Sequence, residues 1–401
     1  MPAGFTPVYK VLKEGADITS NFNSRTLQIK VELKGGNGNS DTCEITIDDR
    51  DWRVEAVEVG VKIEIFLGYK EVGYAQMGVF EVTTVDYEIN PRQIRITGTG
   101  VSFTTSLKSP QIKNFQDKTL GDVLKDFAKQ GGVEAIISPD LAKEKVPFLN
   151  QVSSPLHFIH ELERRYGALA KFENNKLIFV PRDEGETASG LGTMVLLLRP
   201  YNITKGFVRH TTRGEYSGVK VGWYDENHRK HYVEEKNNSA PTDEEGKEQN
   251  EPFLSGRLGR SEAEARSIAK SQLAMLRRST GDLHVTLSKG DPWIRDQMRT
   301  LMKGFRDKID GSYVNEVVTH TYVKDGGINT DIVAKPPGTG ADYSSLDEGN
   351  FYKLGSGGVV GDVGPQLPDG SPIGAAPEQP PLPADPDTPS TPAPVEPPVD
   401  V

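Results

Sequence analysis

The stretch Arg95–Gly132, RITGTGVSFTTSLKSPQIKNFQDKTLGDVLKDFAKQGG, contains the boundary between two kinds of structure. Apolar and polar residues alternate around Ile96, which predicts a β-strand. The alternation slips at Gly98 and Gly100, and Val101 resumes it in the opposite phase. Because glycine inside a strand often marks a bulge or a corner, we expect the sheet to bend at these two residues.

The second half of this stretch predicts a helix over residues 119–130. Thr119 can cap the helix together with Asp122, three residues later, and Gly131 and Gly132 are typical of a helix end. One face of this helix is apolar, formed by Leu120, Val123, Leu124, Phe127 and Ala128. The chain therefore leaves a β-domain here and enters a different module, with no sign of catalytic residues.

Length and composition limit the classes of protein to consider. A chain of 401 residues and 44.0 kDa is expected to form two or three domains. It shows no apolar run long enough for a membrane span and no N-terminal signal segment, so we expect no membrane insertion and no Sec-type export. Its net charge of -10 argues against sequence-specific nucleic-acid binding, which needs a basic surface.

Residues 1–105 predict an all-β domain, a barrel or a sandwich. Three strands show strict alternation, and a glycine- and asparagine-rich run at 35–40 predicts a hairpin connection between the first two. Cys43 is the single cysteine, which excludes an intrachain disulfide, and it shares the inward phase of its strand, which predicts a buried core thiol. The alternating residues are Leu27, Ile29, Val31 and Leu33, then Cys43, Ile45 and Ile47, then Val61, Ile63, Ile65 and Leu67.

Residues 106–182 predict an inserted α+β module. After the helix at 119–130, Ser153 or Ser154 with Pro155 predicts the start of a second helix that ends at Gly167. A hairpin follows, with strands at 169–172 and 177–180 around an Asn-Asn turn. The apolar positions of the second helix are Leu156, Ile159, Leu162 and Tyr166.

Residues 183–335 predict a second β-domain that carries two insertions. The first is a polar loop at 236–252, and the second is a helix at 261–278 with a capping box of Ser261 and Glu264. Its first strand residues include Val219, Val221 and Trp223. The last β-set begins with Leu283, Val285 and Leu287 and continues through Asp310 to Val333.

A weak internal repeat relates the two β-regions. Gly78, Phe80, Val85 and Tyr87 have the same spacing as a second set, Gly311, Tyr313, Val318 and His320. This spacing suggests two copies of one β-module with the mixed module between them.

Residues 336–401 predict a Gly/Pro-rich, acidic tail that is disordered or extended. Lys353 is the last basic residue, and 13 of the 27 prolines lie from Pro365 onward. From Pro377 to Pro392 a proline recurs at every third position, which matches the turn of a polyproline II helix. This segment is either a solvated tail or an arm that docks along a groove of a partner.

Two histidine pairs are the first candidates for a functional site. His157 and His160 lie three apart on the second predicted helix, next to Glu161 and Glu163, but no third metal ligand is evident. His228 and His231 lie in a polar turn. Surface or interface roles are much commoner than metal binding for such pairs.

Other clusters give weaker evidence for a functional site. Asp48, Asp49 and Asp51 lack a calcium-loop spacing, so a polar turn is the better interpretation. The Gly98-Thr-Gly100 segment is not a dinucleotide loop, and nothing after Gly256 and Gly259 supports nucleotide hydrolysis. Arg257 and Arg260, beside those two glycines, are candidates to hold an anion near a helix start. The sequence therefore predicts no catalytic residues, no cofactor and no metal.

The opening stretch and several later segments resemble the phage late control D family of tail hub proteins, over roughly residues 1–335 and in the same order. The hub portion of the VgrG spike proteins of type VI secretion is similar. The segments that carry the resemblance are GADIT (15–19), LGY (67–69), VSFTTSLKSP (101–110), KTLGDVL (118–124), LERRYGALA (162–170), GVKVGWYD (218–225) and IDGSYVNEVVTH (309–320).

This resemblance implies two tube-protein-like β-barrel domains joined by smaller inserted domains. It implies a homotrimer whose six barrels match the six-fold tail tube of a contractile tail and meet the three-fold central spike, with a channel for DNA passage. The implied partners are the tail tube or tube-initiator protein, the spike, the baseplate wedge proteins and the tape measure protein. The implied location is the virion baseplate, after assembly in the host cytoplasm.

The residues leave three alternative functions open. The first is the hub of an R-type bacteriocin or another contractile injection particle. The second is a cell-wall hydrolase at the tail tip, for which the His157/His160 pair and the Asp48–Asp51 cluster are the only support. The third is a carbohydrate-binding β-protein, which would need clustered exposed aromatic residues.

Overall fold

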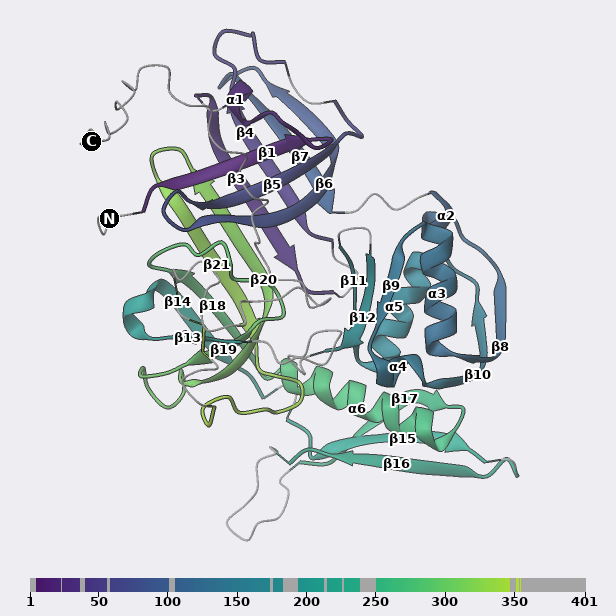
Figure 1. Ribbon diagram of the computed structural model, residues 1–401. Coiled ribbons are helices and arrows are strands. Elements are labelled where there is room, and N and C mark those ends of the chain that lie inside the picture. The colour runs from purple at the N-terminus through teal and green to yellow at the C-terminus, as the bar shows by residue number, and fades with distance from the viewer. Residues whose placement is uncertain are drawn as a thin grey trace, which may run out of the picture.

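The computed structural model describes residues 5–22, 24–36, 40–55, 58–100, 105–173, 176–182, 194–212, 215–225, 227–238, 250–346, 351–352 and 354. Statements about the structure concern these ranges. The fold is mainly β with an inserted α+β module, as predicted (Figure 1).

A 14-stranded sheet runs through both β-rich regions of the chain, in the order β14-β18-β21-β20-β3-β4-β7-β6-β5-β1-β2, with β19, β13 and β22 branching from β20. The N-terminal β-module contains β1 (Pro7–Lys13), β2 (Ala16–Asp17), α1 (Thr19–Phe22), β3 (Thr26–Lys34), β4 (Thr42–Asp48), β5 (Lys62–Tyr69), β6 (Gly73–Glu88) and β7 (Gln93–Gly100). The C-terminal β-module contains β13 (Val195–Leu198), η1 (Pro200–Asn202), β14 (Ile203–His210), β18 (Gly281–Leu287), β19 (Arg299–Met302), β20 (Gly311–Val323), β21 (Gly327–Lys335) and β22 (Phe351–Tyr352).

The two β-modules are joined by one antiparallel ladder, in which residues 28–34 of β3 pair with residues 317–323 of β20. Alternation decides which side chains face inward, and Ile29, Val31, Cys43 and Ile45 are buried as predicted. Tyr9 on β1 donates a hydrogen bond to Thr26 on β3, and its ring packs against that of Tyr322 on β20. The N-terminal strands therefore curl around one apolar core, which also includes residues of the C-terminal module.

The structure has a strand irregularity in this region, but it lies on β6 and not at Gly98 and Gly100 on β7. Strand β7 alternates regularly between half-buried and buried positions up to Gly100, and Val101 lies outside the described residues. The register shifts on β6, where Thr83 is the extra residue opposite Gly98. Gly98 is needed for space, because a Cβ there would lie 2.8 Å from Cys43 Sγ.

The internal repeat has a matching backbone geometry in both copies. Gly78 on β6 has φ +143° and Gly311 on β20 has φ +155°, and the aromatic residue two positions later, Phe80 or Tyr313, is buried. A bulge follows five residues after each glycine, within a hairpin in both cases. Two strands with the same unusual glycine, buried ring and bulge support a duplicated β-module.

The α+β module has its own apolar core between helices and two small sheets. Strand β8 pairs with β10, β11 pairs with β12 as predicted, and β9 adds to β12 in parallel. Sequence reasoning missed β8, β9 and β10, and the Asn-Asn turn lies outside the described residues. The elements are α2 (Thr105–Lys108), β8 (Lys113–Thr119), α3 (Leu120–Gly131), β9 (Glu134–Ile137), α4 (Pro139–Ala142), β10 (Lys145–Gln151), α5 (Pro155–Tyr166), β11 (Ala168–Glu173) and β12 (Lys176–Pro181).

Both predicted helices of this module begin and end where the sequence indicates. Thr119 and Asp122 form the capping box of α3, and Gly132 ends that helix at φ +68°. The Ser154 hydroxyl accepts the His157 N–H at the start of α5, and Gly167 ends it at φ +63°. None of the helices within the described ranges is both long enough and apolar enough to cross a bilayer.

Residues 218–278 form a third small module, so the prediction that their strands join the second β-domain is wrong. Strands β15 (Gly218–Tyr224), β16 (Lys230–Lys236) and β17 (Phe253–Gly259) form a separate sheet, and α6 (Glu262–Arg278) packs on it. The predicted capping box is half present. The Ser261 hydroxyl accepts the Glu264 N–H, but the Glu264 carboxylate accepts the Arg260 N–H instead. Most of the loop at 236–252 lies outside the described residues.

The start of the predicted tail at residue 336 is too early. Tyr343 packs with Val195 and Leu301, and Tyr352 on β22 is 1% exposed. Isolated aromatic residues in a Gly-rich segment give no periodicity, which is why the sequence did not indicate them. The proline repeat from Pro377 onward lies outside the described residues.

Candidate functional site at the junction of the modules

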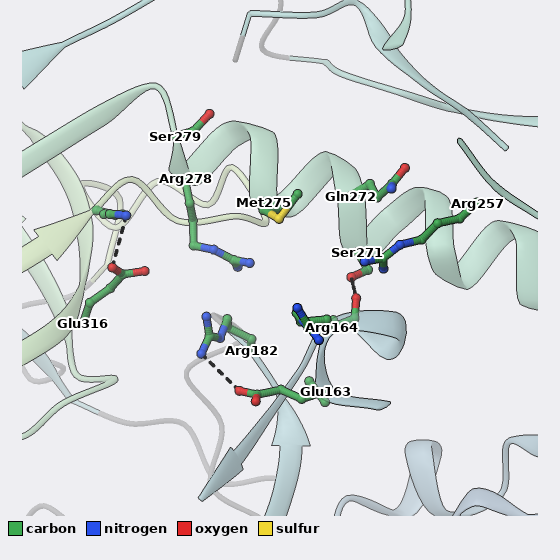
Figure 2. A pocket seen from close by; sticks show the side chains of 13 residues that line it. Glu163, Arg164, Arg182, Arg257, Ser271, Gln272, Met275, Arg278, Ser279 and Glu316 are labelled. Atoms are coloured by element: carbon green, nitrogen blue, oxygen red, sulfur yellow. Dashed lines mark hydrogen bonds and ion pairs between the residues drawn. The ribbon is translucent and has the colours of Figure 1, made fainter. Parts of the chain in front are cut away.

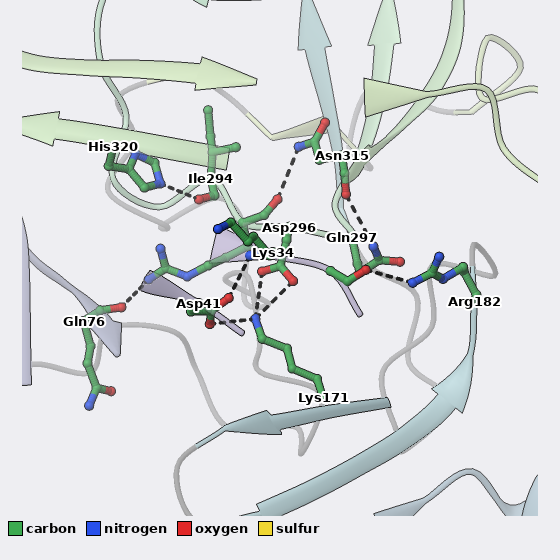
Figure 3. Close-up of polar contacts among 12 residues, drawn as sticks. Lys34, Asp41, Gln76, Lys171, Arg182, Ile294, Asp296, Gln297, Asn315 and His320 are labelled. Atoms are coloured by element: carbon green, nitrogen blue, oxygen red, sulfur yellow. Dashed lines mark hydrogen bonds and ion pairs between the residues drawn. The ribbon is translucent and has the colours of Figure 1, made fainter. Parts of the chain in front are cut away.

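Three parts of the chain meet at the end of the hairpin formed by β3 and β4 (Figure 3). The Gly35 N–H donates to the Glu316 carbonyl at the β20 bulge, over 2.9 Å. The Arg182 Nη2, from the residue after β12, donates to the Gly35 carbonyl over 2.8 Å. The hairpin end is therefore held between the C-terminal β-module and the α+β module.

Both glycines of this junction are closely enclosed, and Gly36 contacts the α+β module. Its φ of +70° favours glycine, and an added Cβ would lie 2.4 Å from Leu169 Cδ1. The same Cβ would lie 2.5 Å from both Arg182 Nη2 and Glu163 Oε1. A larger residue here would have to displace the buried ends of these three side chains.

A buried ion cluster lies beside the hairpin end. The Lys171 ammonium on β11 is 3.1 Å from Asp41 Oδ2 and 3.0 Å from Asp296 Oδ1, and all three side chains are at most 10% exposed. Each residue comes from a different part of the chain. Because burying charges costs about as much free energy as their attraction returns, we assign the cluster mainly to fixing the orientation of the modules.

The loop of residues 288–298, here called the linking loop, contacts both β-modules and the C-terminal strand. The Tyr69 hydroxyl on β5 donates to the Gly290 carbonyl over 2.7 Å. Asp291, which is 1% exposed, accepts from the Tyr352 hydroxyl on β22 and from the Trp293 N–H. The loop therefore fastens β22 to the core.

His320 on β20 holds the middle of the linking loop. Its Nε2 is 2.9 Å from the Ile294 carbonyl, and its Nδ1 is 3.0 Å from the Thr330 hydroxyl. A carbonyl only accepts, so Nε2 carries the proton and Nδ1 accepts from Thr330. Burial lowers the pKa of His320 to about 3, so this ring is neutral and structural at physiological pH.

A cavity of about 270 Å³ opens between the α+β module, α6 and the C-terminal β-module (Figure 2). Arg278 on α6 and Arg182 point toward each other into it, and Arg164 and Arg257 lie at its other end. The Ser271 hydroxyl on α6 donates to the Arg164 carbonyl over 2.9 Å. The cavity is thus formed where α5 packs on α6.

The two histidine pairs lie on α5 and at the β15–β16 hairpin. His157 is exposed, whereas His160 Nδ1 is 3.1 Å from Glu163 Oε2. His228 lies in a turn at φ +60°, and His231 pairs with Asp225 and stacks on Trp223. No group of three potential metal ligands occurs within the described ranges.

The aspartate cluster is a polar turn, as the sequence suggests. Asp48 pairs with Arg50, Asp51 pairs with Arg25, and Asp49 accepts the Val54 N–H. Hydrogen bonds from the Arg25 guanidinium lower the pKa of Asp51 to about 2. Each of these carboxylates therefore has a partner within the turn or on a neighbouring segment.

The remaining candidates also lie apart. Gly256 and Gly259 belong to β17, and of the two neighbouring arginines only Arg257 lines the cavity. Trp52 is exposed on the N-terminal module and Trp293 is buried in the linking loop, so with Trp223 they form no aromatic patch. Burial raises the pKa of Cys43 to about 12, which agrees with an unreactive core thiol.

Sequence reasoning missed the junction because its contacts join residues far apart in the chain. Lys171 and Asp296 are separated by 125 positions, and Arg182 and Gly35 by 147. The adjacent glycines at 35 and 36 are the available signal, and on their own they predict only a hairpin connection.

Comparisons with known proteins agree with this architecture. The chain matches no protein-family model. It is 27% identical over 219 residues to a probable baseplate hub protein of Escherichia phage P2, over 54% of this chain and 56% of that protein. It is 24% identical over 353 residues to a probable baseplate hub protein of Escherichia phage 186, over 80% of this chain and 90% of that protein.

Solved structures share the fold at low sequence identity. A 43 kDa tail protein of prophage MuSo2 from Shewanella oneidensis superposes with a TM-score of 0.58, at 13% identity, over 82% of this chain and 98% of the other. A tail protein from Neisseria meningitidis gives 0.59, at 14% identity, over 82% and 96%. A Francisella PdpA-VgrG complex gives 0.51, at 10% identity, over 86% and 54%. The two relatives confirm the resemblance to phage baseplate hub proteins, and the solved structures confirm the fold.

Proposed function

We propose that this protein is a structural hub in the baseplate of a contractile phage tail. In this proposal three copies form a ring in which six β-modules continue the six-fold tail tube, and the ring meets a three-fold central spike below. The observation that carries the proposal is the repeat within one chain, since Gly78 and Gly311 begin the same arrangement of positive φ, buried ring and bulge. Three chains with two equivalent modules each would give six-fold contacts.

The pattern of stabilising contacts supports a structural rather than a catalytic role. Buried polar groups such as those of Lys171, Asp296 and His320 bind other parts of the same chain. The sequence relatives bear the name of baseplate hub proteins. We therefore assign no catalytic residues.

The proposed partners follow from this role. They are further copies of this chain, the tail tube or its initiator, the spike, baseplate wedge proteins and the tape measure protein. We propose that the ring surrounds the channel through which DNA passes, and that the chain assembles in the host cytoplasm before it joins the virion. We propose a division into the N-terminal β-module, the α+β module, the C-terminal β-module with its inserted 218–278 module, and an acidic C-terminal segment.

Two measurements test the proposal. Light scattering on the purified full chain should give three times the chain mass of 44.0 kDa. Cryo-electron microscopy of tail particles should place the chain between tube and spike. A stable monomer that is absent from the tail tip would refute the hub assignment. Neighbouring genes for a capsid and a portal separate a phage from a bacteriocin or another injection particle.

A further inference from the structure

The two β-modules correspond to each other strand by strand. Their strand orders are β14-β18-β21-β20 and β3-β4-β7-β6, and the glycine repeat lies on the last strand of each, β20 and β6. The first strands match as well, because β3 has a bulge at Leu27 against β4 and β14 has a bulge at Thr204 against β18. Strand β14 is therefore the counterpart of β3, and β6 is the counterpart of β20.

Within the chain β20 pairs with β3, whereas β6 and β14 each keep an unpaired edge among the described residues. From Thr84 to Glu88, β6 pairs with β7 alone, because β5 reaches only to Glu81. Strand β14 pairs with β18 alone and lies at the other end of the path of eight strands that leads to β6 (Figure 1). Both edges are exposed, at Tyr87 to 63% and at Phe207 to 49%. Exposed strand edges of this kind are templates for pairing with another chain.

The backbone groups that face outward on these edges follow from the alternation of antiparallel ladders. The N–H of Thr211, just after β14, donates to the residue before β18 over 2.9 Å, so odd-numbered residues of β14 face β18 and Val208 faces outward. The N–H of Gly100, the last residue of β7, donates to the residue before β4 over 2.7 Å. Even-numbered residues of β7 therefore face β4 and odd-numbered ones face β6, which leaves the backbone of Tyr87 facing outward.

Strand direction decides how a second copy fits. All seven neighbouring pairs on the path from β14 to β6 are antiparallel, so β14 and β6 run in opposite directions. Rotation about a ring axis therefore brings β6 of one copy antiparallel to β14 of the next. Pairing of β14 with itself about a twofold axis would instead bring the cations Lys205 and Arg209 of two copies together, which is unfavourable.

The ladder within the chain predicts the register of a ladder between copies. Glu32 lies opposite Thr319 in the pairing of β3 with β20. Glu32 comes five residues after the bulge of β3, and Arg209 comes five residues after the bulge of β14. Thr319 and Asp86 each come eight residues after the repeat glycine of their strand. Arg209 of one copy therefore corresponds to a position opposite Asp86 of the next.

This register brings complementary groups together. Arg209 and Asp86 are both exposed and oppositely charged, and neither forms an ion pair within the part of the chain that the structure describes. The Arg209 guanidinium lies 5.6 Å from the ring centre of Phe207 on its own strand. The same register places the outward backbone groups of Val208 opposite those of Tyr87, as an antiparallel ladder requires. The bulges and glycines that set the register carry no charge, so the charge match is independent support.

We propose that residues 207–210 of one copy pair with residues 85–88 of the next copy in an antiparallel ladder, with Arg209 opposite Asp86. The ladder that joins the two β-modules within a chain then recurs between chains. This proposal rests on the proposed ring of three copies, and it assigns the strands at which the copies meet.

A disulfide between copies tests the ladder and its register. In this register Arg209 and Asp86 form a non-hydrogen-bonded pair, with Cα atoms about 4.5 Å apart, which a disulfide can bridge. Oxidation of the full chain carrying Arg209→Cys and Asp86→Cys should therefore give a covalent trimer on a non-reducing gel. Cys43, the single native cysteine, is buried, and its resistance to a thiol reagent shows that each variant is folded.

The matched control moves one cysteine along the same strand face. In Arg209→Cys/Thr84→Cys the two Cα atoms would be diagonal neighbours about 7–8 Å apart, beyond the usual reach of a disulfide. This pair should give about tenfold less covalent trimer than the pair at positions 209 and 86.

Charge reversal gives a second measurement that does not depend on oxidation. Arg209→Asp or Asp86→Arg alone places like charges opposite each other and should raise the concentration at which the trimer half-dissociates about fivefold. The double variant Arg209→Asp/Asp86→Arg should return it close to the wild-type value. Lys205→Asp is the control, because Lys205 lies on the same strand but outside the proposed ladder, and it should leave the trimer unchanged.

Four outcomes would overturn the proposal. A trimer by light scattering without a covalent trimer from the pair at positions 209 and 86 would refute this ladder and leave the hub role intact. A monomer at all concentrations would refute the ladder and the ring together. Equal yields from the matched control would refute the register. Covalent dimers from Arg209→Cys alone would show that β14 pairs with itself about a twofold axis.

Discussion

The substitution Gly36→Ala should loosen the α+β module from the β3–β4 hairpin. Two costs add at this position. An alanine at φ +70° costs about 1–2 kcal/mol of backbone strain. The added Cβ would also lie 2.4–2.5 Å from atoms of Leu169, Arg182 and Glu163, and overpacking of this kind costs about 1–3 kcal/mol. The expected loss of stability at the junction is therefore about 2–5 kcal/mol.

Gly132→Ala is the matched control for this substitution. Gly132 has nearly the same φ, +68°, but nothing lies within 4 Å of its added Cβ. Its replacement should cost only the backbone strain, about 1–2 kcal/mol. The difference between the two variants isolates the packing at the junction.

Hydrogen exchange read by mass spectrometry is the suitable assay, because a chain of several modules need not unfold in one step. In Gly36→Ala, peptides of α5 and β11 should lose protection, while peptides of β5 and β6 should keep it. Gly132→Ala should affect only the end of α3. Equal losses in both variants, within about 0.5 kcal/mol, would refute the view that Gly36 is fixed by module packing.

Three further predictions concern other buried groups. Gly98→Ala should lower the melting temperature more than Gly100→Ala, because the nearest atom to the added Cβ is at 2.8 Å for Gly98 and at 3.3 Å for Gly100. Equal melting temperatures of the two variants would contradict the packing argument. Because the pKa of His320 is lowered to about 3, its contribution to stability should be full above pH 6.5 and should fall as the pH drops from 6.5 toward 3, by up to about 1.4 kcal/mol per pH unit. In urea titrations across this pH range, the free energy of unfolding of His320→Gln should decline less steeply than that of the wild type. An unchanged slope would be evidence against a buried neutral ring. Lys171→Met leaves two buried carboxylates without their ammonium and should destabilise the fold by about 3–5 kcal/mol. The double variant Lys171→Met/Asp296→Asn should recover part of this stability in thermal unfolding. No recovery would show that packing rather than charge dominates.

Local signals in the sequence predicted local structure well. Alternation identified β3 and β4, and the caps at Thr119 and Ser154 placed two helix starts at the observed residues. These features depend on neighbouring residues, so one sequence is enough to find them.

Features that depend on distant partners could not be predicted in the same way. The sequence of β7 predicts an irregularity at Gly98, but the bulge is at Thr83 on the neighbouring strand β6, opposite Gly98. Strand residues Val219 and Val221 gave no sign of which sheet they join, and they form a separate module with α6. The ion cluster around Lys171 required the fold itself, because its members are common surface residue types.

The ladder between β3 and β20 has a mechanical consequence. Seven consecutive residue pairs, from Lys34 with Val317 to Gln28 with Val323, join the two β-modules through backbone hydrogen bonds. A pull parallel to these strands stretches every rung of the ladder at once, and a torque between the modules has no single hinge residue at which to act. The two β-modules therefore respond to load as one stiff body. We expect more compliance in the α+β module and in the three-stranded sheet with α6, because no strand ladder among the described residues joins them to the 14-stranded sheet.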